Sequence, residues 1–499
     1  MRKKFLLFIV LIGVFLLVGC TKIPTMQRYD YEVLSYDDIK DQKITLTFRV
    51  RSGVVSTALP DLIKKFENQY PKITVNLDAV GGTYDLIRRT TIGDINSTNA
   101  PDLLIGYPDH FAEYFSSGAL VNLQKFIDDK EVGYTKSEIN DFVDSYMPEN
   151  QGFHPDYSND YYGLPFNKST EVLVYNRTFF QALYGEDEYV NKIPKTWNEV
   201  DTIGKEIISK VKAGQADNVF VESTDPKTGE KTYLKMSKYL ADSLPAPQFY
   251  PFGYDSSDNA FITLVRQFGG QYTERVHVEK GYVLFNNEEA KAALTYFQNL
   301  AKERVFAIAA SFNKKYNSDL VETIQIVMTV GSSAGAAYNT SGRYKYELGA
   351  APIPYYSEDK KLVIQQGTNI AMLNQNTDAE KLAAWLFIKF MLEPENTAQF
   401  AINTGGYLPV RKSAYETEDY KEFLEDPALD QKLWSEAISV ALSYPELGYK
   451  MFVDPAFNGS ATIREKAGEI FAAVIVSNAN VTKRIDQAYR ELKPYVKKD

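Results

Sequence analysis

The chain has 499 residues, of which 44% are hydrophobic and 13% aromatic, with one cysteine and a formal net charge of −10. This length exceeds the number of residues that a single hydrophobic core usually organises, so two domains are expected. The excess of acidic residues disfavours nucleic acid and anionic lipid surfaces as partners, because phosphates require clustered lysine and arginine. A single cysteine excludes an internal disulfide and any CxxC metal or redox site.

The first twenty residues have the pattern of a secretory signal. A basic start at residues 2–4 precedes an unbroken apolar run at residues 5–18. That run is shorter than the roughly 20 residues that a membrane-spanning helix needs. The letters LVGC at residues 17–20 resemble a bacterial lipobox, in which the signal is cut before the cysteine and lipid is attached to it.

We therefore predict a signal peptide at residues 1–19, lipidation of Cys20, and a lipid-anchored linker at residues 20–42. Several acyl chains on one residue anchor a protein stably, since each buried methylene contributes about 0.8 kcal/mol. Loss of the signal leaves 52 basic against 65 acidic residues. The protein is expected at the outer face of the bacterial cell membrane, in contact with it only through the lipid anchor.

Alternating and helical spacings near the start predict a βαβ unit. Residues 43–50 alternate as a strand, residues 59–66 have helical spacing, and residues 73–77 form a second strand. Such units imply a parallel sheet flanked by helices. A buried strand at residues 103–106 then ends in the loop Tyr107-Pro108-Asp109, at the strand's carboxyl end, where open α/β sheets bind ligands.

The stretch at residues 161–175, YYGLPFNKSTEVLVY, is predicted to organise the chain. Turn-forming Gly163 and Pro165 precede a polar cluster at residues 167–170, and strand formers follow it. This order favours a crossover between two lobes, with Ser169 and Thr170 at the junction. An ordinary loop leading into a buried strand is the alternative.

The remaining elements follow from spacing and turn residues. A polar stretch at residues 214–238 predicts a surface insertion or hairpin. Residues 367–372 are interpreted as a return crossing, and residues from 413 onward as almost entirely helical. Further helices are expected at residues 111–126, 197–211, 261–268, 288–302 and 379–392, with strands at 323–330, 348–353 and 362–366.

The segment GSSAG at residues 331–335 matches the nucleophile elbow of α/β-hydrolases, with Ser333 as the candidate nucleophile. That interpretation fails on chain order, because every histidine of the chain precedes Ser333. The small residues could instead leave N–H and hydroxyl groups free to bind an anion or sugar hydroxyls, or simply form a tight turn. A glycosidase with paired carboxylates remains open.

Arg464 is an unusual charge. Thr462 and Glu465 form a capping-box pattern, which would place Arg464 in the first turn of a helix, on the face that Phe471 also occupies. An arginine in that position favours a bound anion. An internal salt bridge or a side chain reaching into solvent is the equally plain alternative.

Taken in order, several motifs resemble the bacterial solute-binding proteins of ABC importers, in the class that includes maltose- and glycerol-3-phosphate-binding proteins. The motifs are FENQYPKITV, APDLLIG, YYGLPFNKSTEVLVYNRTFF, IPKTWNEV, VLFNNEEA, QGTNIAM, AAWLFIKFMLEPENTAQF and TGGYLPVRKSAY. The resemblance implies a type II periplasmic-binding-protein fold, α/β in class, whose two lobes have mixed sheets flanked by helices and close on a hinged central cleft. It also implies a monomer without catalytic activity, cofactor or metal.

By the same resemblance, lobe 1 comprises residues 43–165 and 366–409, and lobe 2 residues 166–365 and 410–499. The ligand-binding positions that match are Tyr84, Asp109, Ser169, Ser332, Gly367, Tyr407 and Arg464. Asp109 is a substitute, because Pro108 stands where the family has an acid. The tryptophans that the family has near residues 256–259 are replaced by Ser-Ser-Asp-Asn.

The sequence thus predicts a receptor that binds a sugar, a glycerol phosphate or a glycerophosphodiester and delivers it to ABC permease subunits. The departure at residues 256–259 favours a more polar pocket or a bulkier solute. A secreted glycoside-active enzyme and a surface lipoprotein that binds a macromolecule are the alternatives.

Overall fold

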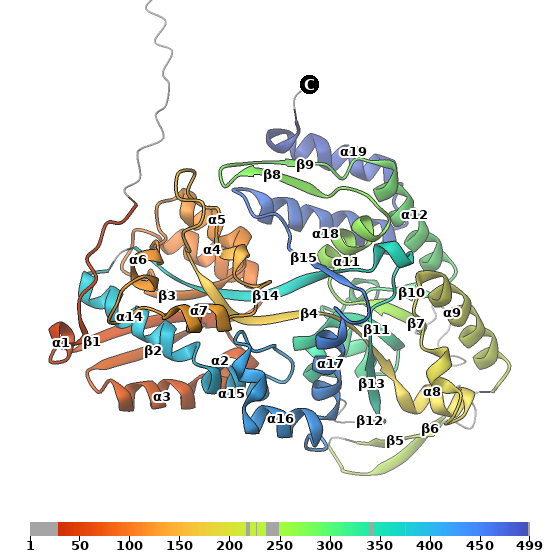
Figure 1. Ribbon diagram of the computed structural model, residues 1–499. Helices are drawn as coiled ribbons and strands as arrows, with labels where there is room; N and C mark the ends of the chain where they lie inside the picture. Colours follow the sequence, from red (N-terminus) through yellow and green to blue (C-terminus); the bar gives the residue numbers. More distant parts are fainter. Residues whose placement is uncertain are drawn as a thin grey trace, which may run out of the picture.

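The computed structural model describes residues 28–215, 220–225, 227–235, 249–339, 344–374 and 376–497. Within them, ten strands form one mixed sheet in the order β10-β7-β11-β4-β14-β3-β1-β2, with β13 paired to β4 and β15 paired to β14 (Figure 1). The predicted signal peptide and Cys20 lie outside the described residues. No helix in the described ranges has both the length and the apolar composition needed to cross a bilayer.

The parallel part of the sheet arises from the first predicted elements. β1 (Ile44–Arg51) and β2 (Ile73–Val80) pair in parallel around α3 (Pro60–Gln69), and β3 (Leu103–Gly106) pairs with β1 on its other side. Alternate side chains of β1 are fully buried, which explains why its periodicity is so clear in the sequence. The predicted βαβ unit is confirmed.

Two helices begin at the carboxyl ends of these strands. α4 (Tyr84–Asp94) follows β2, and α5 (Pro108–Ser116) follows β3. The loop expected at residues 107–109 is wrong: Tyr107 caps α5, Pro108 is its first residue, and Asp109 lies in its first turn. Proline is favoured in this position because its fixed φ suits a helix and its missing N–H is not needed there. The helix expected to run to residue 126 ends at Ser116.

β4 (Leu164–Asn176) is one continuous strand of 13 residues, and every residue in it is buried. Its first part pairs antiparallel with β14 (Leu362–Met372), and its second part pairs with β11 (Ile326–Ser332) and β13 (Leu348–Ala351). Figure 1 shows β4 and β14 running across the molecule from the β1–β3 side to the β11 side. The predicted crossing is confirmed, whereas the loop alternative is wrong.

Two polar residues in the middle of β4, Lys168 and Thr170, are buried together with partners. Lys168 makes an ion pair with the carboxylate of Glu149 and donates to the carbonyl of Gly367 at 3.2 Å. The hydroxyl of Thr170 donates to the carbonyl of Ile364 at 2.9 Å. Burial lowers the pKa of Lys168, opposed by Glu149. Lys168 and Thr170 are therefore paired within the crossing, since an unpaired charge here would be very costly.

The other side of the molecule is built on β11 and its neighbours. β7 (Tyr250–Tyr254) pairs in parallel with β11 and with β10 (Phe306–Ala307). The helices that cover this part of the sheet are mostly those expected from spacing. They are α9 (Trp197–Lys212), α11 (Ser257–Gln267), α12 (Glu288–Lys302), α18 (Ser460–Val476) and α19 (Val481–Glu491).

The remaining helices of the described residues lie elsewhere along the chain. They are α1 (Tyr36–Ile39), α2 (Val54–Ala58), α6 (Gln124–Ile127), α7 (Lys136–Asp141), α8 (Arg177–Tyr184), α13 (Ser318–Glu322), α14 (Asp378–Met391), α15 (Pro394–Thr404), α16 (Glu418–Glu425), α17 (Lys432–Ser443), and the 3₁₀ turns η1 (Pro148–Asn150), η2 (Tyr189–Lys192), η3 (Ala309–Phe312), η4 (Ser333–Asn339), η5 (Glu358–Lys360), η6 (Ser413–Glu416) and η7 (Lys493–Tyr495).

Two expectations about the second half need correction, and one is confirmed. The polar insertion contains a hairpin, β5 (Phe220–Thr224) and β6 (Lys231–Lys235), to which β12 (Tyr344–Lys345) adds. The C-terminal region is less helical than expected, because residues 444–459 contain no helix and include β15 (Lys450–Phe452), which pairs with β14. The capping box is wrong: Gly459 is the N-cap of α18, so the helix starts before Thr462 and Arg464 lies beyond its first turn.

Hydrophobic residues gather in two large clusters, one on each side of the crossing. One joins β1 and β2 with α14, and the other joins β7 and β11 with α9, α11, α12 and α18. A smaller cluster combines Ala398 of α15 with Tyr420 and Leu433 of α16 and α17. A lobe boundary between residues 409 and 410 would pass through this third cluster.

The predicted linker at residues 20–42 is described only from residue 28, and this part contacts the rest of the protein. Tyr31 is buried and its hydroxyl donates to the carbonyl of Asn122 at 2.6 Å, and Ile39 is also buried. Arg28 pairs with Asp160 at 2.8 Å. Residues 28–42 are therefore part of the folded body.

A hairpin from one side of the molecule contacts the other side. It consists of β8 (Thr273–His277) and β9 (Lys280–Val283). Val278 at its turn is buried in an apolar cluster with Leu104 and Phe111, and Arg275 donates to the carbonyl of Gly152. This hairpin links the two sides independently of β4 and β14.

Candidate functional site

A cavity of about 940 Å³ lies beside the crossing of β4 and β14. Ligand pockets in proteins have volumes of about 300 to 1,000 Å³, so this cavity can hold a small solute. Its walls come from both sides of the molecule: the ends of β1 and β11, the starts of α4, α5 and α11, and one face of α18. The lining is rich in hydroxyl, carboxylate and phenol groups, among them Ser52, Asp85, Tyr107, Ser169, Asp255, Asp258, Asp319, Ser332, Tyr338 and Tyr407.

Six of the seven residues predicted from the sequence line this one cavity, although they are far apart in the chain. They are Tyr84, Asp109, Ser169, Ser332, Tyr407 and Arg464. Gly367 is not among the lining residues. It lies against β4 with φ of 96°, where a Cβ atom would collide with the backbone of Asn167 and Lys168. Glycine is therefore required here by the close approach of two strands, which is a structural need.

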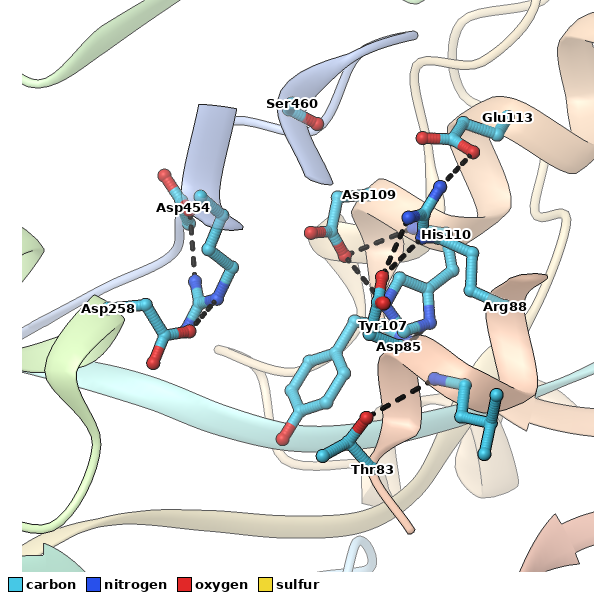
Figure 2. Close-up of polar contacts among 12 residues, drawn as sticks. Thr83, Asp85, Arg88, Tyr107, Asp109, His110, Glu113, Asp258, Asp454 and Ser460 are labelled. Atoms are coloured by element: carbon cyan, nitrogen blue, oxygen red, sulfur yellow. Dashed lines mark hydrogen bonds and ion pairs between the residues drawn. The ribbon is translucent and has the colours of Figure 1, made fainter. Parts of the chain in front are cut away.

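Phenol groups form one wall. Tyr84 and Tyr407 share a hydrogen bond between their hydroxyl oxygens at 2.9 Å, and the ring of Tyr107 meets that of Tyr84 edge to face at 5.3 Å. Thr83 caps α4 by accepting from the N–H of Leu86 at 3.3 Å, which fixes the start of the helix that carries Tyr84 (Figure 2). Burial raises the pKa of Tyr84, so its hydroxyl stays protonated and can donate.

Serines from the two central strands form the floor. Ser332 is the last residue of β11 and pairs with Glu171 of β4, and Ser169 precedes Glu171 by two positions. Ser333 starts a 3₁₀ turn and is fully buried, with its hydroxyl donating to the carbonyl of Gly406 at 3.0 Å. A buried hydroxyl bonded in this way holds the chain in position, which adds a geometric reason against a nucleophile at Ser333.

Arg464 is held by an internal network. Its Nε donates to Asp258 at 2.8 Å and its Nη1 to Asp454 at 3.0 Å, while Nη2 donates to the side chain of Asn259. Figure 2 shows Asp258 and Asp454 on the same side of the site. Of the two alternatives left open by the sequence, the internal salt bridge is thus the one present. Asp258 and Asn259 belong to the segment that departs from the family pattern.

These contacts change the titration of both acids. Burial alone would raise the pKa of Asp258, but Arg464 brings it below its ordinary value. Burial raises the pKa of Asp454 to about 6, although Arg464 opposes that change. The pKa of Arg464 is raised by its acids in spite of burial. The arginine is therefore permanently charged and largely neutralised by its neighbours.

Asp109 lies on the opposite wall, at the start of α5. Its Oδ1 accepts from the backbone N–H of His110 at 3.0 Å. Figure 2 shows Asp109 across the site from Asp258 and beside a second network, in which Arg88 pairs with Asp85 and with Glu113 at 2.6 Å. Burial lowers the pKa of His110, so it is neutral at pH 7. The carboxylate of Asp109 is placed to accept from a solute hydroxyl.

Sequence reasoning missed Arg51 and Asp255. Arg51 ends β1, donates from Nε to the carbonyl of Gly82 at 3.1 Å, and contacts the hydroxyl of Tyr316 at 3.4 Å. Asp255 accepts from the N–H of Asn317 at 2.6 Å, and burial raises its pKa to about 6. Arg51 is the last residue of one parallel strand, and Asp255 directly follows another. Their location at the carboxyl edge of the sheet is the sequence signal that could have identified them.

A two-lobed α/β binding protein is the class that this fold and cavity define. Residues 61–431 match the family of the bacterial extracellular solute-binding protein. The chain belongs to this family.

Similar proteins agree with that assignment. The sn-glycerol-3-phosphate-binding periplasmic protein UgpB of Shigella flexneri serotype 5b is 23% identical over 388 residues, which cover 76% of this chain and 77% of that protein. Mycobacterium tuberculosis UgpB, solved with glycerophosphocholine, superposes with a TM-score of 0.69 at 21% identity, covering 90% of this chain and 98% of its own. Maltose-bound T. maritima MalE3 has a TM-score of 0.66 at 18% identity, covering 90% and 99%.

Proposed function

We propose that this protein is the lipid-anchored receptor of an ABC importer, which holds a sugar or a solute of the glycerol phosphate type in the cavity and delivers it to the permease. The supporting observation is a cavity of about 940 Å³ whose polar and aromatic walls come from both sides of the crossing. Relatives named for glycerol-3-phosphate, and neighbours solved with glycerophosphocholine and with maltose, support this range of solutes.

In this proposal the solute is bound by groups of both walls. Tyr84 and Tyr407 supply phenol donors and ring faces, Asp109 accepts from hydroxyls, and Ser169 and Ser332 bind further hydroxyls. Arg464 faces the solute as part of its ion-paired network. Gly367 acts indirectly, by allowing β14 to approach β4.

We also propose that the lobes, residues 43–165 with 366–409 and residues 166–365 with 410–499, exchange between open and closed states. The hinge would lie near Pro165, Gly367 and Pro409, and a solute that contacts both lobes would favour the closed state. The released solute is chemically unchanged, so no catalytic group is needed.

Mass spectrometry of the small molecules that co-purify with the protein tests the proposal, followed by calorimetric titration with the compound found. An unchanged sugar or glycerol phosphate at one per chain supports the receptor. Conversion of that compound over time would instead establish an enzyme. Retention of a macromolecule, with no small solute bound, would favour a surface lipoprotein that binds a macromolecule.

The anchor has its own test. Wild-type protein and a Cys20→Ser variant can be compared by detergent phase partitioning of cells that express them. The wild type should enter the detergent phase and the variant should not, because only the former can carry lipid. Equal partitioning of the two would contradict the anchor but leave the solute-binding proposal intact.

A further inference from the structure

Two arginines, Arg51 and Arg464, are among the residues that line the cavity, and they differ in what surrounds them. Every side-chain nitrogen of Arg464 donates to Asp258, Asp454 or Asn259. An anion placed there would meet two carboxylates at once. Like charges in a site of low dielectric repel strongly, so Arg464 is poorly suited to bind a phosphate.

Arg51 has no carboxylate partner within the part of the chain that the structure describes. Its two hydrogen bonds go to the neutral carbonyl of Gly82 and to the hydroxyl of Tyr316, the latter at the long limit of 3.4 Å. Its Nη1 makes no hydrogen bond to any described residue. Burial alone would lower the pKa of Arg51, but the surrounding phenol groups raise it overall. The charge is therefore present, and no described carboxylate pairs with it.

The groups beside Arg51 are donors suited to an oxyanion. The guanidinium carbon lies 5.5 Å from the ring centre of Tyr84. A Cβ atom at Gly53, two residues beyond Arg51, would lie 3.6 Å from the hydroxyl of Tyr338. Phenol hydroxyls and a guanidinium both donate, and hydrogen bonds from a charged donor to an oxyanion are stronger than neutral ones.

Acidic residues of the cavity gather at α11 and α13, and two more, Asp85 and Asp109, lie on the α4–α5 wall, where Arg88 pairs with Asp85. Asp255 and Asp258 lie at the start of α11 and Asp319 in α13, and the charges of Asp258 and Asp319 act on Asp255. This side of the cavity repels an anion but can accept hydrogen bonds from hydroxyl groups. The cavity therefore combines a cation among phenols at the end of β1 with a group of carboxylates at α11 and α13.

We propose that Arg51 is the residue that recognises the anionic group of the solute, with its hydroxylated part directed toward Asp255 and Asp258. This inference rests on the proposed function and narrows it to solutes that carry a phosphate or phosphodiester. Arg464 is then a positioning residue, which holds α11 against α18 and shapes the opposite wall.

Calorimetric titration of the purified protein tests this assignment. The anionic probes are glycerol 3-phosphate and glycerophosphocholine, and the uncharged probe is maltose. The variants are Arg51→Gln, which keeps donors but loses the charge, Arg51→Lys, which keeps the charge, and Arg490→Gln, an exposed control on α19. Circular dichroism and melting curves confirm that each variant is folded.

We expect wild-type protein to bind at least one anionic probe more tightly than maltose. Arg51→Gln should weaken that binding tenfold or more, which corresponds to about 1.4 kcal/mol, while Arg51→Lys recovers part of it and Arg490→Gln changes nothing. The affinity of wild type should fall as salt is added, and that of Arg51→Gln should fall less.

Equal affinity of wild type and Arg51→Gln for the anionic probes would overturn the assignment. Binding of maltose alone would also overturn it while leaving the receptor proposal in place. If no small solute bound to the wild type in any experiment, the receptor proposal itself would fail.

Discussion

Arg464 and Arg51 face one cavity from different sides, and they differ in the partners of their charges. Arg464 joins α11 and α18 through Asp258 and Asp454, whereas Arg51 ends β1 among phenol groups, with no described carboxylate as a partner. A charge with a full set of acidic partners contributes to folding and has little left for a ligand. A charge that lacks them stabilises the fold less and is available for binding. The residue type alone does not distinguish the two cases.

The largest effect is expected from Arg464→Met. Removal of this side chain leaves Asp258 and Asp454 without their cation, and breaking a buried ion pair costs about 3–5 kcal/mol. Because the Arg464 side chain is 20% exposed, we expect a smaller loss of unfolding free energy, about 2–3 kcal/mol. Urea denaturation at pH 7 measures it. The matched control Arg51→Met should lose less than about 1 kcal/mol, and an equal loss would remove the distinction between the two arginines.

The pH dependence of stability should also differ between the two regions. The folded pKa of Asp454 is about 6, above its ordinary value, so the folded state binds more protons than the unfolded state between the two values. Stability should therefore fall as the pH rises through about 6 and recover on acidification. Asp454 is faced by Arg464, Asp109 and Arg266.

Melting temperatures between pH 5 and 8 test this expectation. In Asp454→Asn, the fall in the free energy of unfolding between pH 5 and 8 should be smaller than in wild type by on the order of 1–2 kcal/mol, and the melting temperature should follow. Arg51→Met should have the same pH dependence as wild type. Raised pKa values of Asp255, about 6, and Glu171, about 7, act in the same direction and remain in both variants. A slope that Asp454→Asn leaves unaltered would contradict the assignment to this carboxyl group.

A moderate effect is expected on the phenol side. Tyr84→Phe removes the hydrogen bond to Tyr407, and a neutral hydrogen bond contributes about 1 kcal/mol to stability. Urea denaturation should show a loss of that size. Tyr36→Phe is the control, since no described residue bonds to its hydroxyl. Equal stability of Tyr84→Phe and wild type would indicate that the two phenols are solvated separately.

The smallest effect concerns the rim. Arg89 of α4 pairs with Glu465 of α18 at 2.6 Å, and the two side chains are 53% and 47% exposed. Exposed pairs contribute little, so Arg89→Gln should change the free energy of unfolding by less than about 0.5 kcal/mol. Any change should disappear at high salt. A loss comparable to that of Arg464→Met would show that the rim pair, and not the internal network, holds α18 in place.

Much of the fold could be predicted because its signals are local. The alternation of β1 and the spacing of α3 and α12 identify those elements directly. The continuity of β4 could not be predicted in this way. Its polar middle is satisfied by partners such as Gly367, 199 residues from Lys168, and no local pattern reports such pairing.

The site shows the same limit. The order of motifs identified six residues that line the cavity, whereas the seventh, Gly367, lies against β4. For Arg464 the sequence left an anion and a salt bridge equally open, because Asp258 lies 206 residues away in the chain. The charge balance of a cavity depends on which distant side chains meet, and spacing within a motif carries no information on that.

The strand order has a consequence for synthesis of the chain. β14 lies between β3 and β4, yet it comes about 190 residues later than β4. A nascent chain that has emerged only as far as β4 therefore exposes two unpaired strand edges, which are templates for aggregation. Closure of such a distant pairing is slow, and large proteins pass through partly folded states while they wait. Emergence of residue 372 thus sets the earliest moment at which the first sheet can be completed, so chaperones should engage this protein before that point.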